Sequence, residues 1–160
     1  MPLKPKILIA DDSAMNRAIL VEMLGDGYDI LEAENGREAV QILQSGSEID
    51  LLLLDIMMPE MDGFEVLEQM KRYGWIEEVP VIMISAENGS AYVERAYDLG
   101  ATDFISRPFD MAIVRRRVTN TLMLYTKQKQ LVGLVAKQVY ENQKSNNLMI
   151  SILSHIVEFR

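Results

Sequence analysis

Short apolar runs alternate with amphipathic segments from residue 6 to residue 110, and this alternation constrains the fold more than any other feature. The apolar runs, which we read as strands, are 6–10, 28–33, 50–55, 79–85 and 102–106. Helices are predicted at 13–25, 35–46, 63–74 and 90–100, and another begins after Pro108. Strands that alternate with helices of this length form parallel sheets, because right-handed crossovers carry the helices over the sheet faces. The sequence predicts an α/β fold with a five-stranded, parallel, doubly wound sheet and helices on both faces.

The segments 50–55 and 13–25 show the strand pattern and the helix pattern most clearly. The run DLLLLD at 50–55 is aliphatic throughout, which is typical of a strand that is buried on both faces of a parallel sheet. The helix at 13–25 has Ser13 as a possible N-cap and Gly25 as a stop signal. Its apolar residues at helical spacing are Ala14, Ala18, Val21 and Leu24.

The composition excludes several classes of chemistry. With 160 residues, 49% of them hydrophobic, the chain is long enough to bury one core. It has no cysteine, which removes disulfides, thiol catalysis and cysteine-based zinc sites, and its single histidine is His155. No apolar run approaches the ~20 residues that cross a bilayer, and the opening MPLKPKILIA is too short for a signal peptide. We therefore expect a cytoplasmic protein that does not bind membranes.

Charge is distributed unevenly along the chain. Residues 1–110 hold eight Lys and Arg against 22 Asp and Glu, whereas residues 111–160 hold eight against two. The acidic part disfavours binding to a phosphate backbone, so no direct contact with nucleic acid is expected. The basic part is interpreted as the solvated face of a helix rather than a surface for DNA or anionic lipid.

The pattern changes from about residue 109, where no further strand is evident and no glycine occurs before Gly133. Apolar residues there fit two positions of a heptad repeat. One position holds Met111, Val118, Tyr125, Val132, Val139, Asn146 and Leu153, and the other holds Val114, Thr121, Gln128, Val135, Asn142, Met149 and Ile156. A long helix that pairs in a parallel homodimer, with the asparagines fixing the register, is one interpretation. The alternatives are a helix folded back on its own domain and a mobile tail. We predict domains at 1–125 and 126–160.

Polar residues gather at the carboxyl ends of the predicted strands. Asp11 and Asp12 follow the first strand, Asp55 ends the third, Ser85 ends the fourth and Arg107 follows the fifth. These ends are neighbours in a doubly wound sheet, where ligands bind. Three carboxylates would repel one another unless a cation intervened, and such oxygen ligands suit Mg²⁺. An Asp-Asp pair alone is more often a helix N-cap, so the combination carries the prediction.

The chemistry that these groups could perform is phosphoryl acceptance. A carboxylate such as Asp55 can attack phosphorus and form an acyl phosphate. The metal and Arg107 would offset charge on the transferred oxygens, and the Ser85 hydroxyl could donate a hydrogen bond to them.

The motifs LIADDS, LLLLDIMMPEMDGFEVL, VIMISA and ATDFISRPF, in this order, resemble the receiver domain of two-component response regulators over residues 4–125. The resemblance implies a flavodoxin-like fold in which Asp55 is the phosphoacceptor. It also implies that Asp12 and Asp55 bind Mg²⁺ directly, that Asp11 binds it mainly through water, and that the backbone carbonyl of Met57 is a further ligand. Ser85 would be the switch hydroxyl. The partner would be a sensor histidine kinase or a phosphotransfer protein.

Two positions leave alternatives open. Phe104 occupies the aromatic switch position of the family, and it could equally be an ordinary core residue. The family has lysine where this chain has Arg107, and the two cations are not interchangeable. A phosphorylation switch is expected, and the alternative is a degenerate receiver that acts as a constitutive dimerisation module. The resemblance also implies a cis peptide bond between Arg107 and Pro108.

Two further resemblances bear on enzymatic activity. The segment NNLMISILSHIVEFR at 146–160 is similar to the linker that precedes an HD-type phosphodiesterase domain, often acting on cyclic dinucleotides. The chain has no His-Asp doublet, so it would be a fragment that leads to an absent output domain, with His155 a packed or surface residue. Haloacid-type phosphatases have a similar sheet but need an acid two residues after the nucleophile, where this chain has Met57. We therefore predict that the chain itself is not an enzyme.

Overall fold

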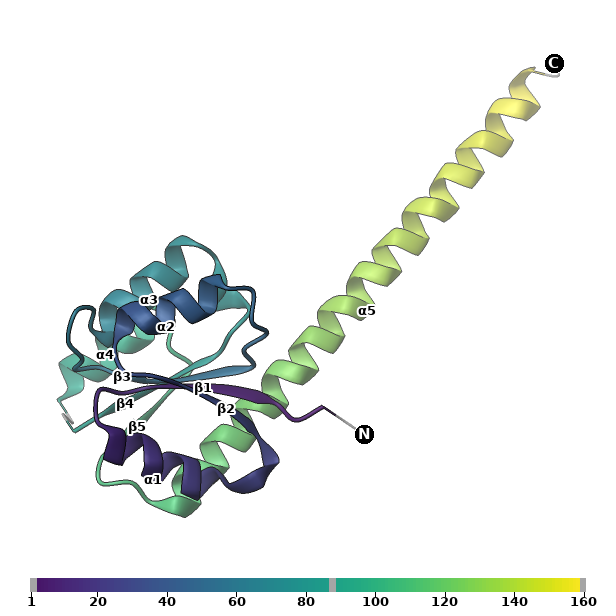
Figure 1. Cartoon of the computed structure of the whole chain (residues 1–160). Coiled ribbons are helices and arrows are strands. Elements are labelled where there is room, and N and C mark those ends of the chain that lie inside the picture. The colour runs from purple at the N-terminus through teal and green to yellow at the C-terminus, as the bar shows by residue number, and fades with distance from the viewer. Residues whose placement is uncertain (1–2, 87–88, 159–160) are drawn as a thin grey trace. The chain divides into compact units, whose positions relative to one another are not determined.

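A computed structural model describes residues 3–86 and 89–158 and shows one parallel sheet of five strands in the order β2-β1-β3-β4-β5 (Figure 1). The strands are β1 (Lys6–Ala10), β2 (Asp29–Ala33), β3 (Leu51–Asp55), β4 (Val81–Ser85) and β5 (Asp103–Ser106). The predicted five-stranded, doubly wound parallel sheet is confirmed, and each strand lies within its predicted range.

Helices connect the strands and extend beyond the last one. They are α1 (Ala14–Leu24), α2 (Gly36–Gln44), α3 (Gly63–Arg72), α4 (Ser90–Asp98) and α5 (Met111–Glu158), with short 3-10 turns η1 (Gly25–Gly27) and η2 (Trp75–Glu77). The Ser13 side chain accepts a hydrogen bond from the Asn16 amide at 3.2 Å, and Gly25 follows the helix with φ 75°. The predicted start and end signals of this helix are confirmed.

Helices cover both faces of the sheet (Figure 1), and a cluster of apolar side chains lies on each face. On one face, Leu52 and Leu54 of β3 pack in a cluster with residues of α2, α3 and α4. On the other face, Leu51 and Leu53 pack with residues of α1 and the first turns of α5. All five residues of β3 are buried, whereas α4 buries only Ala96. The central strand is therefore held from both sides, and α4 is held lightly.

Only some of the apolar residues at helical spacing in α1 lie against the core, namely Leu24, which is buried, and Val21, which is partly buried beside it. The buried residues of this helix are Arg17, Leu20 and Leu24, whereas Ala14 and Ala18 are exposed. Apolar residues occur on every side of the helix, so spacing did not select one face. Longer side chains fill the space above the sheet better than two alanines do, and this burial decides the orientation.

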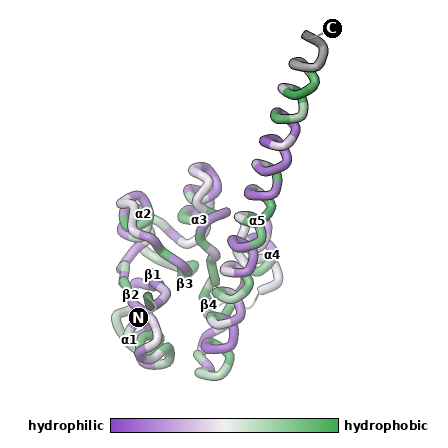
Figure 2. Tube along the Cα trace, turned by 90° about the vertical axis from the view of Figure 1, so that its right-hand side faces the viewer, coloured by the Kyte–Doolittle hydropathy of each residue, from purple (hydrophilic) through white to green (hydrophobic). Residues whose placement is uncertain are grey.

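Internal contacts divide the chain into two units, Met1–Leu122 and Met123–Arg160, and α5 contributes to both. Val114, Val118 and Thr121 are buried within the first unit, so these heptad positions serve its core and are not available to a dimer. In the second unit the side chains from 126 to 154 are exposed. Hydrophobic and hydrophilic residues are interspersed along this part of α5 (Figure 2). Within the described parts of the chain, no helix combines the length and hydrophobicity that a membrane crossing requires.

Two glycines allow the backbone to approach closely near the end of β3. A Cβ atom on Gly63 would lie 2.4 Å from the carbonyl oxygen of Asp55, and one on Gly36 would lie 2.2 Å from that of Met61. The Gly63 amide also donates to the Ile56 carbonyl at 2.8 Å. Because the opposing atoms are backbone, they cannot turn aside as a flexible side chain would. The start of α3 is therefore fixed against the strand that carries Asp55.

Replacing Gly63 with alanine is expected to lower the free energy of unfolding by about 1–3 kcal/mol, because the new methyl group must displace backbone. Urea denaturation of the full chain measures this change. Gly133→Ala is the control, since nothing lies within 4 Å of a Cβ at that position of α5. There alanine should stabilise the helix by up to about 1 kcal/mol. A Gly63 variant as stable as the parent chain would contradict the close approach.

Candidate functional site

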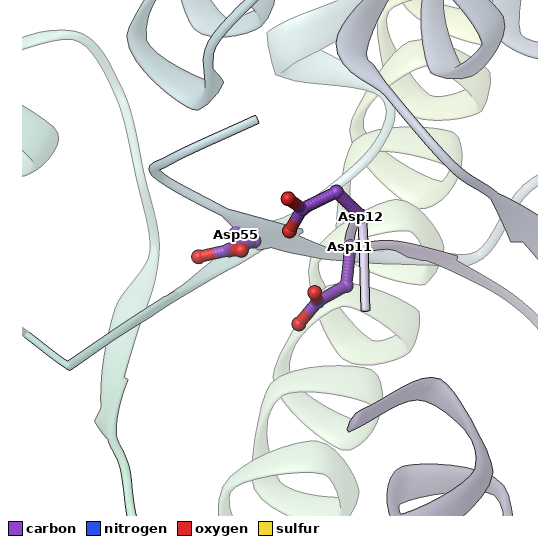
Figure 3. A group of neighbouring side chains, drawn as sticks. All are labelled: Asp11, Asp12 and Asp55. Carbon is purple, nitrogen blue, oxygen red and sulfur yellow. The ribbon is translucent and has the colours of Figure 1, made fainter. Parts of the chain in front are cut away.

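Three carboxylates converge at the carboxyl ends of two neighbouring strands. Asp11 and Asp12 follow β1, Asp55 ends β3, and the two strands pair with Ala10 opposite Leu54. One oxygen from each of the three acids can be chosen so that all lie within 4.8 Å of one another. Their side chains project toward the same region (Figure 3). The convergence predicted from the strand ends is confirmed.

The acids differ in their surroundings. Asp11 and Asp55 are each 1% exposed, whereas Asp12 is exposed. The Asp11 Oδ1 atom accepts a hydrogen bond from the Ser13 amide at 2.9 Å. The Asp11 Oδ2 atom is buried and has no hydrogen-bond partner within the described part of the chain. A buried carboxylate oxygen of this kind calls for a positive group to neutralise it.

Arg107 pairs with the acid at the end of the central strand. Its Nη2 atom donates to the Asp55 Oδ1 atom at 2.8 Å, and the Arg107 side chain is 24% exposed. The Arg107 amide donates to the Ser85 carbonyl at 2.9 Å, which fixes this loop to β4. The Arg107–Pro108 peptide bond is cis, as the resemblance implied. The residue that follows β5 therefore places a positive charge beside Asp55.

Burial and mutual repulsion favour the protonated forms of Asp11 and Asp55. Burial, followed by the charge of Asp11, raises the pKa of Asp55 to about 7, although Arg107 and a hydrogen bond from the backbone of Met57 oppose the shift. Burial also raises the pKa of Asp11. Without a further cation, the cluster therefore retains a proton near neutral pH.

A hard divalent cation fits this donor set. Carboxylate oxygens are the ligands that Mg²⁺ prefers, and it commonly keeps several waters while bound to few carboxylates. The buried Asp11 Oδ2 atom, which has no hydrogen-bond partner in the described part of the chain, can accept a bond from a water held by such an ion. An ion here would also offset the repulsion that raises the pKa of Asp55.

Comparison with known families decides what kind of domain this is. Residues 7–119 match the sequence pattern of the response regulator receiver domain. The chain belongs to this family. The receiver domain, which is not itself a catalytic fold, accounts for the first unit and for the position of the acidic cluster.

Relatives of the receiver domain include proteins of different lengths. A probable cyclic di-GMP phosphodiesterase of Vibrio cholerae is 32% identical over 161 residues, 96% of this chain, and the chain spans 36% of that relative. A rice two-component response regulator, ORR5, is 31% identical over 119 residues, 74% of this chain and 89% of that protein. The structure of the Vibrio cholerae chemotaxis protein CheY4 has a TM-score of 0.69 and 27% identity, covering 74% of this chain and 99% of that one.

The other predicted site residues lie at or near the receiver strand ends. Ser85 is buried at the end of β4, in register with Ser106 of β5. Phe104 is 7% exposed and packs in the cluster on the α4 face of the sheet, a position compatible with either role expected of it. Met57 is exposed, two residues after Asp55. The side chain of His155 lies outside the described residues.

One residue that contacts the acidic cluster was missed by sequence reasoning. The Nη1 atom of Arg17 donates to the Asp11 carbonyl at 2.6 Å, from a position on the buried face of α1. The sequence offered only a weak signal, because Arg17 stands three residues before Leu20 and seven before Leu24, which places all three on one of several apolar faces of the helix. An arginine on the buried face of a helix marks a place where a charge has fixed partners.

Proposed function

We propose that the chain is a phosphorylation-dependent signalling switch that accepts a phosphoryl group on Asp55. The observation that carries the proposal is the convergence of Asp11, Asp12 and Asp55. Arg107 forms an ion pair with Asp55 at the same place. Asp55 also ends the fully buried strand β3, which gives the acceptor a rigid support. Membership of the receiver family supports the same assignment.

The residues that would hold Mg²⁺ are Asp12 and Asp55 directly, Asp11 mainly through water, and the Met57 carbonyl. When bound, the ion supplies positive charge that offsets the carboxylates and the transferred phosphoryl oxygens. An Asp55 oxygen attacks phosphorus of a phosphohistidine on the donor. The new O–P bond forms as the N–P bond breaks, and the histidine nitrogen keeps the electron pair and takes a proton. The product is an acyl phosphate on Asp55.

Arg107 and Ser85 would respond to the new charge. The Arg107 guanidinium, already 2.8 Å from Asp55, can follow the phosphoryl oxygens with charge-assisted hydrogen bonds. The Ser85 hydroxyl would donate to the same group, and Phe104 would change its packing under α4. The lightly held α4 and the helix α5 would then carry the change to partners.

The donor would be a cytoplasmic sensor histidine kinase or a phosphotransfer protein. The similarity of 96% of this chain to part of a probable cyclic di-GMP phosphodiesterase of Vibrio cholerae supports a phosphodiesterase output domain beyond α5. The resemblance of residues 146–160 to a linker is the reason to propose the HD type for it. On this proposal the chain is a regulatory module, not an enzyme with its own turnover. Nucleic acid and membranes are not among its direct partners.

The proposal is tested by incubating the chain with acetyl phosphate, with Mg²⁺ or with excess EDTA. Mass spectrometry of the intact chain should show one added phosphoryl group only when the metal is present. Beryllofluoride with Mg²⁺ should produce a corresponding change in amide chemical shifts around Ser85 and α4. A chain that responds to neither reagent in the presence of Mg²⁺ is not a phosphorylation switch.

A second candidate function is a constitutive dimerisation module, which the second unit favours. Large apolar side chains there are 50–65% exposed, including Leu131, Val132, Leu134, Val135 and Val139. In a parallel homodimer through this part of α5, the predicted heptad residues from Val132 onward would form the seam. Asn142 and Asn146 would fix its register.

Truncation after Tyr125 is expected to convert a dimer into a monomer in sedimentation velocity, because it removes the exposed apolar residues from Leu131 onward. In the full chain, Val132→Asp combined with Val139→Asp should have the same effect, since it buries charge in the seam. Gln130→Asp is the control, because residue 130 lies between the heptad positions 128 and 132 and outside the predicted seam. This variant should leave the dimer intact. A truncated chain that remains dimeric would place the interface in the first unit instead.

A further inference from the structure

Arg17 lies where α1, β1 and β2 meet, with 8% of the residue exposed. Its Nε atom is 3.0 Å from the Oε1 atom of Glu32, and its Nη2 atom is 3.8 Å from the Oε1 atom of Glu34. Its Nη1 atom donates to the Asp11 carbonyl at 2.6 Å, a hydrogen bond that is buried. The two glutamates are 48% and 73% exposed at the side chain, so they hold the guanidinium from the solvent side.

The Asp11 carbonyl belongs to the peptide unit that joins Asp11 to Asp12. The preceding peptide is held by β2, because the Asp11 amide donates to the Ala33 carbonyl at 3.1 Å. The following peptide leaves the sheet, and Arg17 is the group that holds it. Both peptides are thus tied to β2, one through Ala33 and the other through Arg17 and Glu32. The rotation of this peptide sets the directions of the Asp11 and Asp12 side chains.

We propose that Arg17 is a positioning residue for the divalent cation site, acting by fixing the peptide between Asp11 and Asp12. This inference rests on the proposed function, in which these acids bind Mg²⁺. The rigid, forked guanidinium can bond a carbonyl and a carboxylate at the same time, which a lysine ammonium cannot do in the same geometry. Groups that orient metal ligands in this way contribute to metal affinity although they do not touch the ion.

The direction in which metal affinity changes when Arg17 is replaced distinguishes a positioning role from a purely electrostatic one. Removing a positive charge near an acidic cluster should strengthen the binding of a cation if charge alone mattered. Loss of the hydrogen bond to the Asp11 carbonyl should instead weaken cation binding, because Asp11 and Asp12 would no longer be held in place. Arg17→Met keeps most of the side-chain volume and removes the bond, whereas Arg17→Lys keeps the charge.

Isothermal titration calorimetry of the full chain with Mg²⁺, and electron paramagnetic resonance with Mn²⁺, give the dissociation constants. Arg17→Met is expected to weaken binding about tenfold or more, the effect typical of outer partners of metal ligands. Arg17→Lys should recover part of this loss. The melting temperature without metal reports stability separately, and the extra melting temperature gained with Mg²⁺ should shrink in proportion to the lost affinity.

Leu24→Ala is the matched control, since Leu24 is buried at the other end of α1. It should destabilise the chain but leave the metal affinity unchanged. Should Arg17→Met fail to fold, Glu32→Gln weakens the same anchor from the exposed side and should lower metal affinity by a smaller factor. Equal affinity in the parent chain and both Arg17 variants, or a gain in Arg17→Met, overturns the positioning role. Absence of Mg²⁺ binding in the parent chain instead overturns the proposed function.

Discussion

Asp55→Asn is expected to abolish covalent phosphorylation of the chain by acetyl phosphate. Asparagine fits the same space at the end of β3 but lacks the carboxylate oxygen that attacks phosphorus. Asp11 and Asp12 remain in the variant, but neither ends the buried strand β3 or pairs with Arg107 in the way that Asp55 does. We therefore expect a complete loss of the phosphorylated species rather than a shift to a neighbouring acid.

Intact-mass spectrometry after incubation with acetyl phosphate and Mg²⁺ measures this loss. Asp50→Asn is a matched control, because Asp50 immediately precedes the other end of β3, where its carboxylate accepts a hydrogen bond from the Lys6 amide at 2.8 Å. This variant should be phosphorylated as readily as the parent chain. A phosphorylated species of parental yield in Asp55→Asn would assign the acceptor role to another residue.

The stability of the metal-free chain should fall as pH rises from about 4 to about 7, because folding raises the pKa of Asp55 from 3.8 to about 7. Between these values the folded state holds a proton that the unfolded state releases, so each rise in pH favours unfolding. The stabilisation is complete below pH 3.8 and is lost as the pH passes through the folded pKa. The full shift corresponds to a free energy on the order of 4 kcal/mol.

Urea denaturation in EDTA at pH 5 and pH 8 isolates this contribution when the parent chain is compared with Asp55→Asn. The parent should lose on the order of 2 to 3 kcal/mol more than the variant over this interval. Mg²⁺ should restore stability to the parent at pH 8 by binding the ionised folded form, with little effect on the variant. Parallel pH profiles for the two chains would show that Asp55 titrates normally.

The acidic cluster could be predicted from the sequence because it depends only on local patterns. Aliphatic runs such as LLLLD show where strands end, and parallel topology then brings those ends together. The positions of Asp11, Asp12 and Asp55 followed without knowledge of any distance. The roles of Ser85 and Phe104 depend on the phosphorylated state and stay predictions.

Features that depend on side-chain packing could not be predicted in the same way. Arg17 was missed because α1 carries apolar residues all round, so the choice of buried face depended on volume and on partners from β2. Val114 and Val118 fit a heptad repeat, but in the structure their side chains pack against the sheet and are buried in the first unit. The approach of Gly63 to the Asp55 carbonyl is a tertiary distance with no sequence signature.

The contrast between a fully buried β3 and an α4 that buries only Ala96 has a practical consequence for biosensor construction. The proposed acceptor carboxylate stands on a strand whose five residues are all buried, so we expect a fluorophore beside it to report chemistry but little movement. A probe on the outer surface of α4, for example at the exposed Glu94, would sit on a helix that buries a single residue and that we expect to rearrange more easily. The native chain contains no cysteine, so a single engineered thiol could be labelled there without background.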